Sequence, residues 1–407
     1  MMANLGSDGF LVMALLAALL LGLACAPGGV VLMVKRMSLT GDMLAHAVLP
    51  GVVVGVAGDA HPLLILGYAL VSGLVGQALL YGLMRSTRLK QDAVLGIVLC
   101  VLFAAGVWLI SRWQPTGVQH WLYGQLSAIS RDDLELLLIV AVLSVVLAGV
   151  LIRAWKTWAF DAGFAALAGF PVRTLEVIFH VWLTAVIVVA MQAVGVVLVT
   201  ALLVTPAVAA TRWSARMGVM MVVATLIAIF GAVMGVLGSH YFGYAGGPAA
   251  VLALTGLTAC SFLVGPRDGL VVKFFQRRSM NFRMAEDDFL KALWKSERGE
   301  GAQDEMRDSV ARRLVFRGML GGKVGAWNLT EAGDRRATEL VRGHRLWEKY
   351  LRDRADYADD HVHEDAERVE HFLDDHTREQ LAESLGHPQY DPHGKKIPLS
   401  QEGGQGR

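Results

Sequence analysis

Long apolar runs alternate with short polar breaks along roughly the first two thirds of the chain. A helix needs about 17 to 25 apolar residues to cross a bilayer. Runs near this length lie at about 10–34, 44–58, 63–84, 92–111, 133–153, 172–191, 194–211, 217–238 and 247–265. They predict nine spans, or eight if the two runs beside Gly195 form one broken helix. Pro50 and Pro206 predict kinks within spans, where neighbouring helices can satisfy the freed backbone groups.

The pattern changes after about Gly265. About twenty charged residues precede this point and about fifty follow it, so the net charge of +1 averages two unlike regions. The first region predicts an all-α polytopic membrane domain, and the second a water-soluble, mostly α domain. Basic residues gather at alternate breaks between the runs. This bias predicts a cytoplasmic tail and, with nine spans, an external N-terminus.

The tail divides into short predicted elements. Helices are expected at about 284–298, 305–318, 330–350, 360–373 and 375–385, the third of them capped by Thr330. Gly321 and Gly322 predict a turn, followed by a strand at 327–330. The predicted domains are a transmembrane domain at 1–266, a basic juxtamembrane linker at 267–283, a cytoplasmic domain at 284–398 and a disordered end at 399–407.

The segment GDMLAHAVLPG, residues 41–51, places ionisable groups inside an apolar region. Asp42 and His46 are four residues apart, so they share one face of a helix. Ionisable groups within a span usually mark the path of an ion or substrate. Carboxylate and imidazole suit Mn²⁺, Fe²⁺ and Zn²⁺ alike. The structural alternative is that Asp42 caps the helix and His46 bonds a neighbouring backbone group. Glu176 and His180 repeat the spacing and are interpreted as a pair at the membrane interface.

The segment FDAGFAALAGFP, residues 160–171, is a short, amphipathic and aromatic break between two runs. It predicts either a helix that lies on the membrane surface or a helix that docks another cytoplasmic subunit. On the residues alone both interpretations stay open. The positions that matter for either are Phe160, Asp161, Phe164, Leu167, Gly169 and Pro171.

Together these motifs resemble the permease subunits of bacterial zinc/manganese/iron ABC transporters. The likeness covers about residues 10–265 and rests on KRMSL at 35–39, the two segments above, AVGV at 193–196 and LVTPA at 203–207. It implies that residues 160–171 couple to a separate cytoplasmic ATPase and that Asp42 and His46 are linked to metal passage. It also implies an extracytoplasmic metal-binding protein and a second permease, identical or different. No stretch matches the phosphate-binding G-x-x-x-x-G-K-[ST] loop, so the chain is not expected to be an enzyme.

The tail carries acid and imidazole side chains at helical spacing. His363, Glu367, Glu370 and His371 would share one face of a helix, and His344 and Glu348 form a similar pair on the preceding one. A charged, solvated helix face is the alternative interpretation.

The tail also resembles the iron- and manganese-dependent repressors of the diphtheria-toxin-repressor type. The likeness covers about 284–398 and rests on LTEAG at 329–333, RGHRLWE at 342–348, HEDAERVEH at 363–371 and the GHP and DPHG motifs within 386–394. It implies a winged-helix/dimerisation-like fold. The implied manganese-type site consists of Asp288, His344, Glu367, Glu370 and His371, and the implied ancillary site of His344, Glu348 and His363. Glu367 stands where the iron-type repressors have Cys, and a carboxylate favours a harder ion.

The tail departs from the repressors in two ways. Lys291 stands where they offer a Glu ligand, which predicts a weaker site. Residues 298–313 leave little room for the two helices of a helix-turn-helix, and acidic residues (Asp304, Glu305 and Asp308) replace the basic ones that DNA reading requires. The second departure argues against DNA binding.

The sequence therefore predicts the permease subunit of an ABC importer for divalent transition-metal ions in the bacterial inner membrane. Manganese is the first expectation, iron the second, and zinc follows. No covalently bound cofactor is expected, and the ion would be both substrate and regulatory ligand of the fused metal-sensing tail. One alternative is a membrane-tethered, metal-dependent transcription regulator. Another is a tail that only stabilises the permease dimer.

Overall fold

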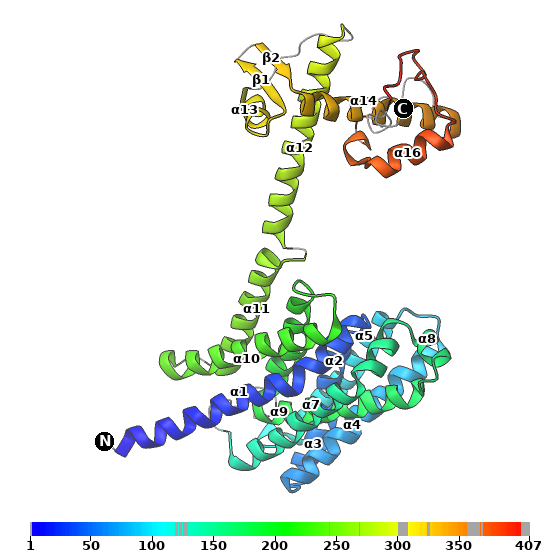
Figure 1. Ribbon diagram of the computed structural model, residues 1–407. Coiled ribbons are helices and arrows are strands. Elements are labelled where there is room, and N and C mark those ends of the chain that lie inside the picture. The colour runs from blue at the N-terminus through cyan, green and yellow to red at the C-terminus, as the bar shows by residue number, and fades with distance from the viewer. Residues whose placement is uncertain are drawn as a thin grey trace. The chain divides into compact units, whose positions relative to one another are not determined.

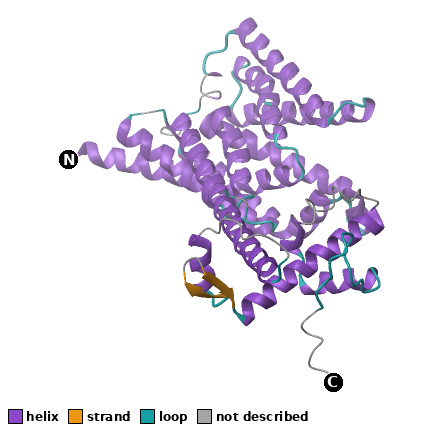
Figure 2. Cartoon of the chain, turned by 90° about the horizontal axis from the view of Figure 1, so that it is seen from above, coloured by secondary structure: helices purple, strands orange, loops and turns teal. Residues whose placement is uncertain are grey.

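The computed structural model of the chain describes residues 2–118, 121, 124, 129–243, 245–267, 269–299, 308–323, 326–355, 367 and 369–399. The chain divides into two compact units, Met1–Val272 and Lys273–Arg407, here called the membrane unit and the tail unit. Helices dominate the described residues of both units, and the strands form one small hairpin in the tail unit (Figures 1 and 2).

The membrane unit consists of packed helices (Figure 1). Its described helices are α1 (Met2–Val34), α2 (Leu39–Ala47), α3 (Leu49–Ala57), α4 (Pro62–Ser86), α5 (Gln91–Trp113), α7 (Arg131–Phe160), α8 (Ala162–Leu167), α9 (Val172–Ala210), α10 (Met217–Phe242) and α11 (Gly246–Val264). Within the described residues, eight helical segments are long and apolar enough to cross a membrane, with α2 and α3 together forming one of them. The multi-pass, all-α membrane domain expected from the apolar runs is confirmed.

Helix α9 explains why the runs suggested both eight and nine spans. Gly195 lies inside it with φ 77° and ψ 169°, a conformation that only glycine adopts readily. Trp182 packs against Gly28 of α1, whereas Leu203 packs against the adjacent Gly29. In a straight helix these two residues of α9 would lie about 30 Å apart. The helix therefore doubles back at Gly195, and its two halves run in opposite directions.

Aromatic packing fixes the first half of α9 to α7. The rings of Trp155 and Trp182 stack with centroids 5.1 Å apart, and the buried Trp182 Nε1 donates to Ser144 Oγ at 2.9 Å. His180 is also buried, and its Nδ1 lies 2.7 Å from the carbonyl oxygen of Glu176. A histidine that bonds its own helix in this way fits the structural interpretation of the Glu176–His180 pair.

The tail unit has a different construction. Helix α12 (Leu270–Glu297) begins at the end of the membrane unit and is followed by α13 (Asp308–Phe316), the antiparallel strands β1 (Leu320–Lys323) and β2 (Ala326–Leu329), α14 (Glu331–Ala355), the 3₁₀ turn η1 (Glu370–Phe372) and α16 (Asp375–Ser384). One core joins α12, α13, β1 and α14 through Leu293, Leu314, Leu320 and Ala337. A second joins α14 to α16 through Leu346 and Leu381.

Several tail elements differ from expectation. The predicted turn at Gly321 and Gly322 is wrong, because both glycines pair with β2 as part of strand β1. The basic segment 273–283 is the first part of α12 rather than a separate linker. Thr330 caps α14 as expected, with its Oγ1 accepting from Gly333 N at 3.2 Å. The helix predicted at 360–373 mostly lies outside the described residues, as does His363, and its described end is the η1 turn.

Candidate metal centre

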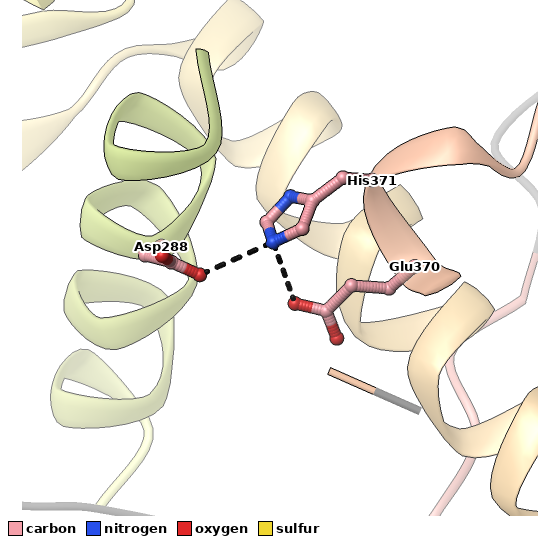
Figure 3. Close-up of side chains that lie close together, drawn as sticks. All are labelled: Asp288, Glu370 and His371. Carbon is pink, nitrogen blue, oxygen red and sulfur yellow. Dashed lines mark ion pairs between the residues drawn. The ribbon is translucent and has the colours of Figure 1, made fainter. Parts of the chain in front are cut away.

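Three side chains of the tail unit meet in one cluster (Figure 3). Asp288 comes from α12, whereas Glu370 and His371 come from η1. Each offers one ligand atom, and these atoms all lie within 4.8 Å of one another. His371 Nε2 is 3.4 Å from Asp288 Oδ1 and 3.8 Å from Glu370 Oε1. The tight η1 turn places Glu370 and His371 side by side toward α12.

A second layer of contacts orients His371. Its Nδ1 lies 3.4 Å from Asp287 Oδ2, and Asp287 is itself held by two contacts with Arg336, of 3.1 and 2.9 Å. Hydrogen bonds to Asp287 and Asp288 raise the pKa of His371 to about 9. With Nδ1 facing Asp287, Nε2 is the atom that carries either a proton or an ion. A carboxylate behind a histidine ligand is the usual way of fixing its tautomer in metal sites.

Glu370 is the buried centre of the cluster. Its Oε2 lies 2.5 Å from His344 Nδ1, and its Oε1 lies 2.6 Å from Lys291 Nζ. Burial by itself would raise the pKa of Glu370, but the hydrogen bond from His344 and the charge of Lys291 outweigh it and lower the pKa. Glu370 is therefore ionised at neutral pH.

The other predicted tail residues surround this core. His344 Nε2 lies 3.1 Å from Glu348 Oε1, and both side chains are buried. Burial lowers the pKa of His344, yet its hydrogen bonds with Glu348 and Glu370 produce a net rise. Glu367 is half exposed, and its Oε1 lies 3.8 Å from Lys291 Nζ. The structure thus brings together four residues of the implied manganese-type set and places Glu367 beside Lys291.

The donor set fits a divalent transition-metal ion. It offers one imidazole nitrogen and two carboxylates, donors that suit Mn²⁺, Fe²⁺ and Zn²⁺. Neighbouring ligand atoms around a six-coordinate ion with bonds of about 2.1 Å lie roughly 3 Å apart, only slightly less than the distances from His371. Asp287 and Arg336 were not singled out from the sequence, although the adjacent Asp-Asp pair was an available signal.

The membrane unit holds the other predicted pair. Asp42 and His46 lie on one face of α2, with His46 Nε2 3.6 Å from Asp42 Oδ1 and side chains 24% and 40% exposed for His46 and Asp42. The ring of His46 meets the ring of Phe103 edge-on, 5.0 Å away. The N-cap of α2 is Ser38, so Asp42 lies in the first turn and is not the cap. The pair is accessible at the surface of the single chain.

The predicted coupling loop is an exposed helical corner. Asp161 caps the short helix α8, accepting from Gly163 N at 2.8 Å and Phe164 N at 3.0 Å. Gly169 has φ 85°, which favours glycine, and Pro171 is the N-cap of α9. Phe160, Phe164 and Leu167 are 65%, 61% and 90% exposed. Three large apolar side chains thus project from one tight, capped turn.

Comparisons with known proteins agree with this division into two parts. Residues 7–265 match the model of the ABC 3 transport family, and residues 330–399 match the iron dependent repressor, metal binding and dimerisation domain. A probable metal transport system membrane protein of Chlamydia trachomatis is 28% identical over 98% of both chains. The zinc transport system membrane protein TroC of Treponema pallidum is 34% identical over 70% of this chain and 98% of its own.

Among solved structures, the chain is similar to PsaBC from Streptococcus pneumoniae in complex with Fab. The TM-score is 0.60 at 27% identity, covering 68% of this chain and all of that one. Further similar permeases carry the names of manganese and chelated-iron transport systems. The similar permeases therefore span several metals, and the similarity to the Chlamydia trachomatis protein extends over the tail.

Proposed function

The chain belongs to the ABC 3 transport family, and on that premise we propose that it is the membrane permease of an ABC importer for divalent transition-metal ions. Manganese is the proposed substrate, ahead of iron and zinc. The observation that carries the proposal is the pairing of two features in one family member: an acid–imidazole pair on α2 and a capped, apolar corner at α8.

The α8 corner is the proposed docking surface for a separate ATPase. Exposed Phe160, Phe164 and Leu167 offer apolar anchors, and buried aromatic anchors dominate the energy of most protein interfaces. Asp161 holds the turn in shape before binding, which lowers the ordering cost. Because α9 begins at Val172, directly after the corner, a displacement of α8 passes straight into the membrane unit.

Asp42 and His46 are the proposed waypoint for the ion. They supply one carboxylate and one imidazole, fewer ligands than a stable metal site uses. An exposed pair of this kind binds weakly, which suits transport because a tight site would retain the ion. An extracytoplasmic metal-binding protein would deliver the ion, and a second permease, identical or different, would complete the pathway.

The tail unit is proposed to sense cytoplasmic metal. When the ion concentration inside rises, Asp288, Glu370 and His371 bind an ion, and the tail then slows further import. These three ligands come from two elements that lie far apart in the tail sequence, α12 and η1. Binding would therefore cross-link these elements, and an ion that binds one arrangement better shifts the population toward it.

Transport into proteoliposomes tests both parts. The permease, reconstituted with its ATPase and binding protein, should import Mn²⁺, and preloading the lumen on the tail side with Mn²⁺ should slow import. A full-length Glu370→Gln/His371→Gln variant should import at the unloaded rate under both conditions. Equal inhibition of this variant, or of a chain lacking residues 284–407, would exclude feedback through the tail. Absence of ATP-dependent uptake by any chain would exclude the permease role itself.

One observation favours the alternative hypothesis, a membrane-tethered transcription regulator. Arg312 and Arg313 are exposed on α13, beside the hairpin of β1 and β2. Helix α13 is short, however, and Arg317 at its end is engaged by Glu286 at 2.6 Å. Salt-sensitive, sequence-specific DNA binding by the full-length protein, lost in an Arg312→Ala/Arg313→Ala variant, would establish the rival.

A further inference from the structure

Lys291 occupies a position among the acidic ligands of the tail unit that a second cation would otherwise take. Its Nζ lies 2.6 Å from Glu370 Oε1 and 3.8 Å from Glu367 Oε1, and the residue is 7% exposed. This buried ammonium therefore supplies positive charge next to two carboxylates of the cluster. It is also part of the fold, since Leu290 and Leu293 on either side of it belong to the core of the tail unit.

Lys291 lowers the negative charge that the cluster can offer to ions. Its ammonium pairs with Glu370 and lies near Glu367, while Asp287 is paired with Arg336 and Glu348 with His344. A second divalent ion beside this ammonium would add positive charge to a partly buried site, where unbalanced charge is costly.

The adjacent cavity also opposes a second cation. A cavity of about 40 Å³ lies beside His344 and Glu348, the described members of the implied ancillary site. Its wall includes four cationic side chains, Lys291, Lys295, Arg345 and Lys395, against the two carboxylates of Glu348 and Asp391. Repulsion from the neighbouring Lys291, Lys395 and Arg345, added to the larger effect of burial, lowers the pKa of Lys295.

We propose that Lys291 is a built-in cation that takes the place of a second metal ion, so that the tail unit binds one divalent ion, at Asp288, Glu370 and His371. Single-ion binding makes the response of each tail to metal hyperbolic. It also leaves the ion-free cluster partly neutralised, because Lys291 pairs with Glu370 in the absence of metal. This inference rests on the proposed sensing role of the tail.

The test counts ions on the full-length protein in detergent. Mn²⁺ bound per chain is measured by calorimetry and by elemental analysis, and the value for the Glu370→Gln/His371→Gln variant is subtracted to remove ions bound elsewhere. We expect one tail ion for the natural chain. Lys291→Glu replaces the ammonium with a carboxylate ligand and reverses the charge at this position, so this variant should bind two. The resulting pair of close Mn²⁺ ions should give a spin-coupled paramagnetic resonance signal.

The matched control is Lys295→Glu, the same substitution one turn further along α12, which should leave the count at one. Two tail ions in the natural chain, one in Lys291→Glu, or two in Lys295→Glu would each overturn the inference while leaving metal sensing intact. Zero tail ions in every chain would overturn the sensing role itself, and ATP-dependent uptake would still report on the permease independently. Circular dichroism and a retained transport rate confirm that each variant is folded.

Discussion

The membrane unit and the tail unit use the same two ligand types in opposite settings. On α2, Asp42 and His46 are partly exposed, and the ring of His46 meets that of Phe103 edge-on. In the tail, His371 is 8% exposed, held from behind by Asp287 and Arg336, and faces Asp288 and Glu370. The first arrangement suits weak binding of an ion that is soon released, and the second suits tighter binding of an ion that is sensed. For the proposed transport and sensing roles, the ligand types are therefore the same, and the surrounding contacts differ.

Removing the tail histidine should give the largest effect. His371→Ala deletes the only nitrogen ligand of the described three-residue cluster, so Mn²⁺ affinity at the tail should fall by about 100-fold or more. Uptake into metal-free vesicles should be unchanged, because Asp42 and His46 are untouched. Calorimetry measures the Mn²⁺ affinity, and a transport assay of the same preparation measures the uptake. A parallel loss of uptake would mean that the two sites are not separate.

The pH dependence of tail affinity should be steep. The pKa of His371 is raised from 6.5 to about 9 by Asp287 and Asp288 in the metal-free fold. A proton must therefore leave before Mn²⁺ binds, and affinity should rise by up to about tenfold per pH unit between 6.5 and 9. In metal-free protein the same raised pKa stabilises the fold below pH 6.5, and this stabilisation is lost as the pH rises through about 9.

Asp287→Asn provides the control for this pH effect. It keeps the size of the side chain but removes the charge behind His371. The pH range over which the Mn²⁺ affinity rises should therefore move to lower values. Affinity measured by calorimetry from pH 6 to 9 in natural and Asp287→Asn protein checks both statements. A flat profile in the natural protein would contradict the proposed competition between proton and ion at Nε2.

A smaller effect is expected at the membrane pair. Asp42→Asn leaves His46 in place and removes one of two weak ligands, so Mn²⁺ uptake should fall by about tenfold. The tail titration should be unchanged. Radiotracer uptake in proteoliposomes measures the Mn²⁺ uptake. The matched control is Asp59→Asn, which removes the same charge in the break before α4. Loss of uptake in the control alone would place the ion path elsewhere.

The smallest effect should come from the α8 cap. Asp161→Ala removes the acceptor for Gly163 N and Phe164 N, which costs about 1 kcal/mol of helix stability. Coupling to the ATPase should therefore weaken by a few fold. The measurement is the rate of ATP hydrolysis that the permease stimulates, which should fall. Asp161→Asn, which can still cap, should retain most of it. Equal losses in both variants would assign the effect to charge instead.

Much of the architecture followed from the sequence because bilayer thickness sets the length of apolar runs. The sequence left open whether the two runs beside Gly195 are separate spans, since the answer depends on α1 contacting both halves of α9 through Gly28 and Gly29. In the tail, spacing and family resemblance found Glu370 and His371. The roles of Lys291 and Asp287 depend on contacts 79 and 84 residues apart in the chain, which no local pattern encodes.

Helix α9, which doubles back at Gly195, links the α8 corner to the neighbourhood of Asp42. Its first half starts at Val172, just beyond the α8 corner, and its second half brings Leu203 against Gly41, the neighbour of Asp42. Between these ends α9 consists of two helical segments that meet at Gly195. In the proposed mechanism, a movement of α8 by the ATPase would bend α9 at Gly195 and shift Leu203, and with it the surroundings of Asp42.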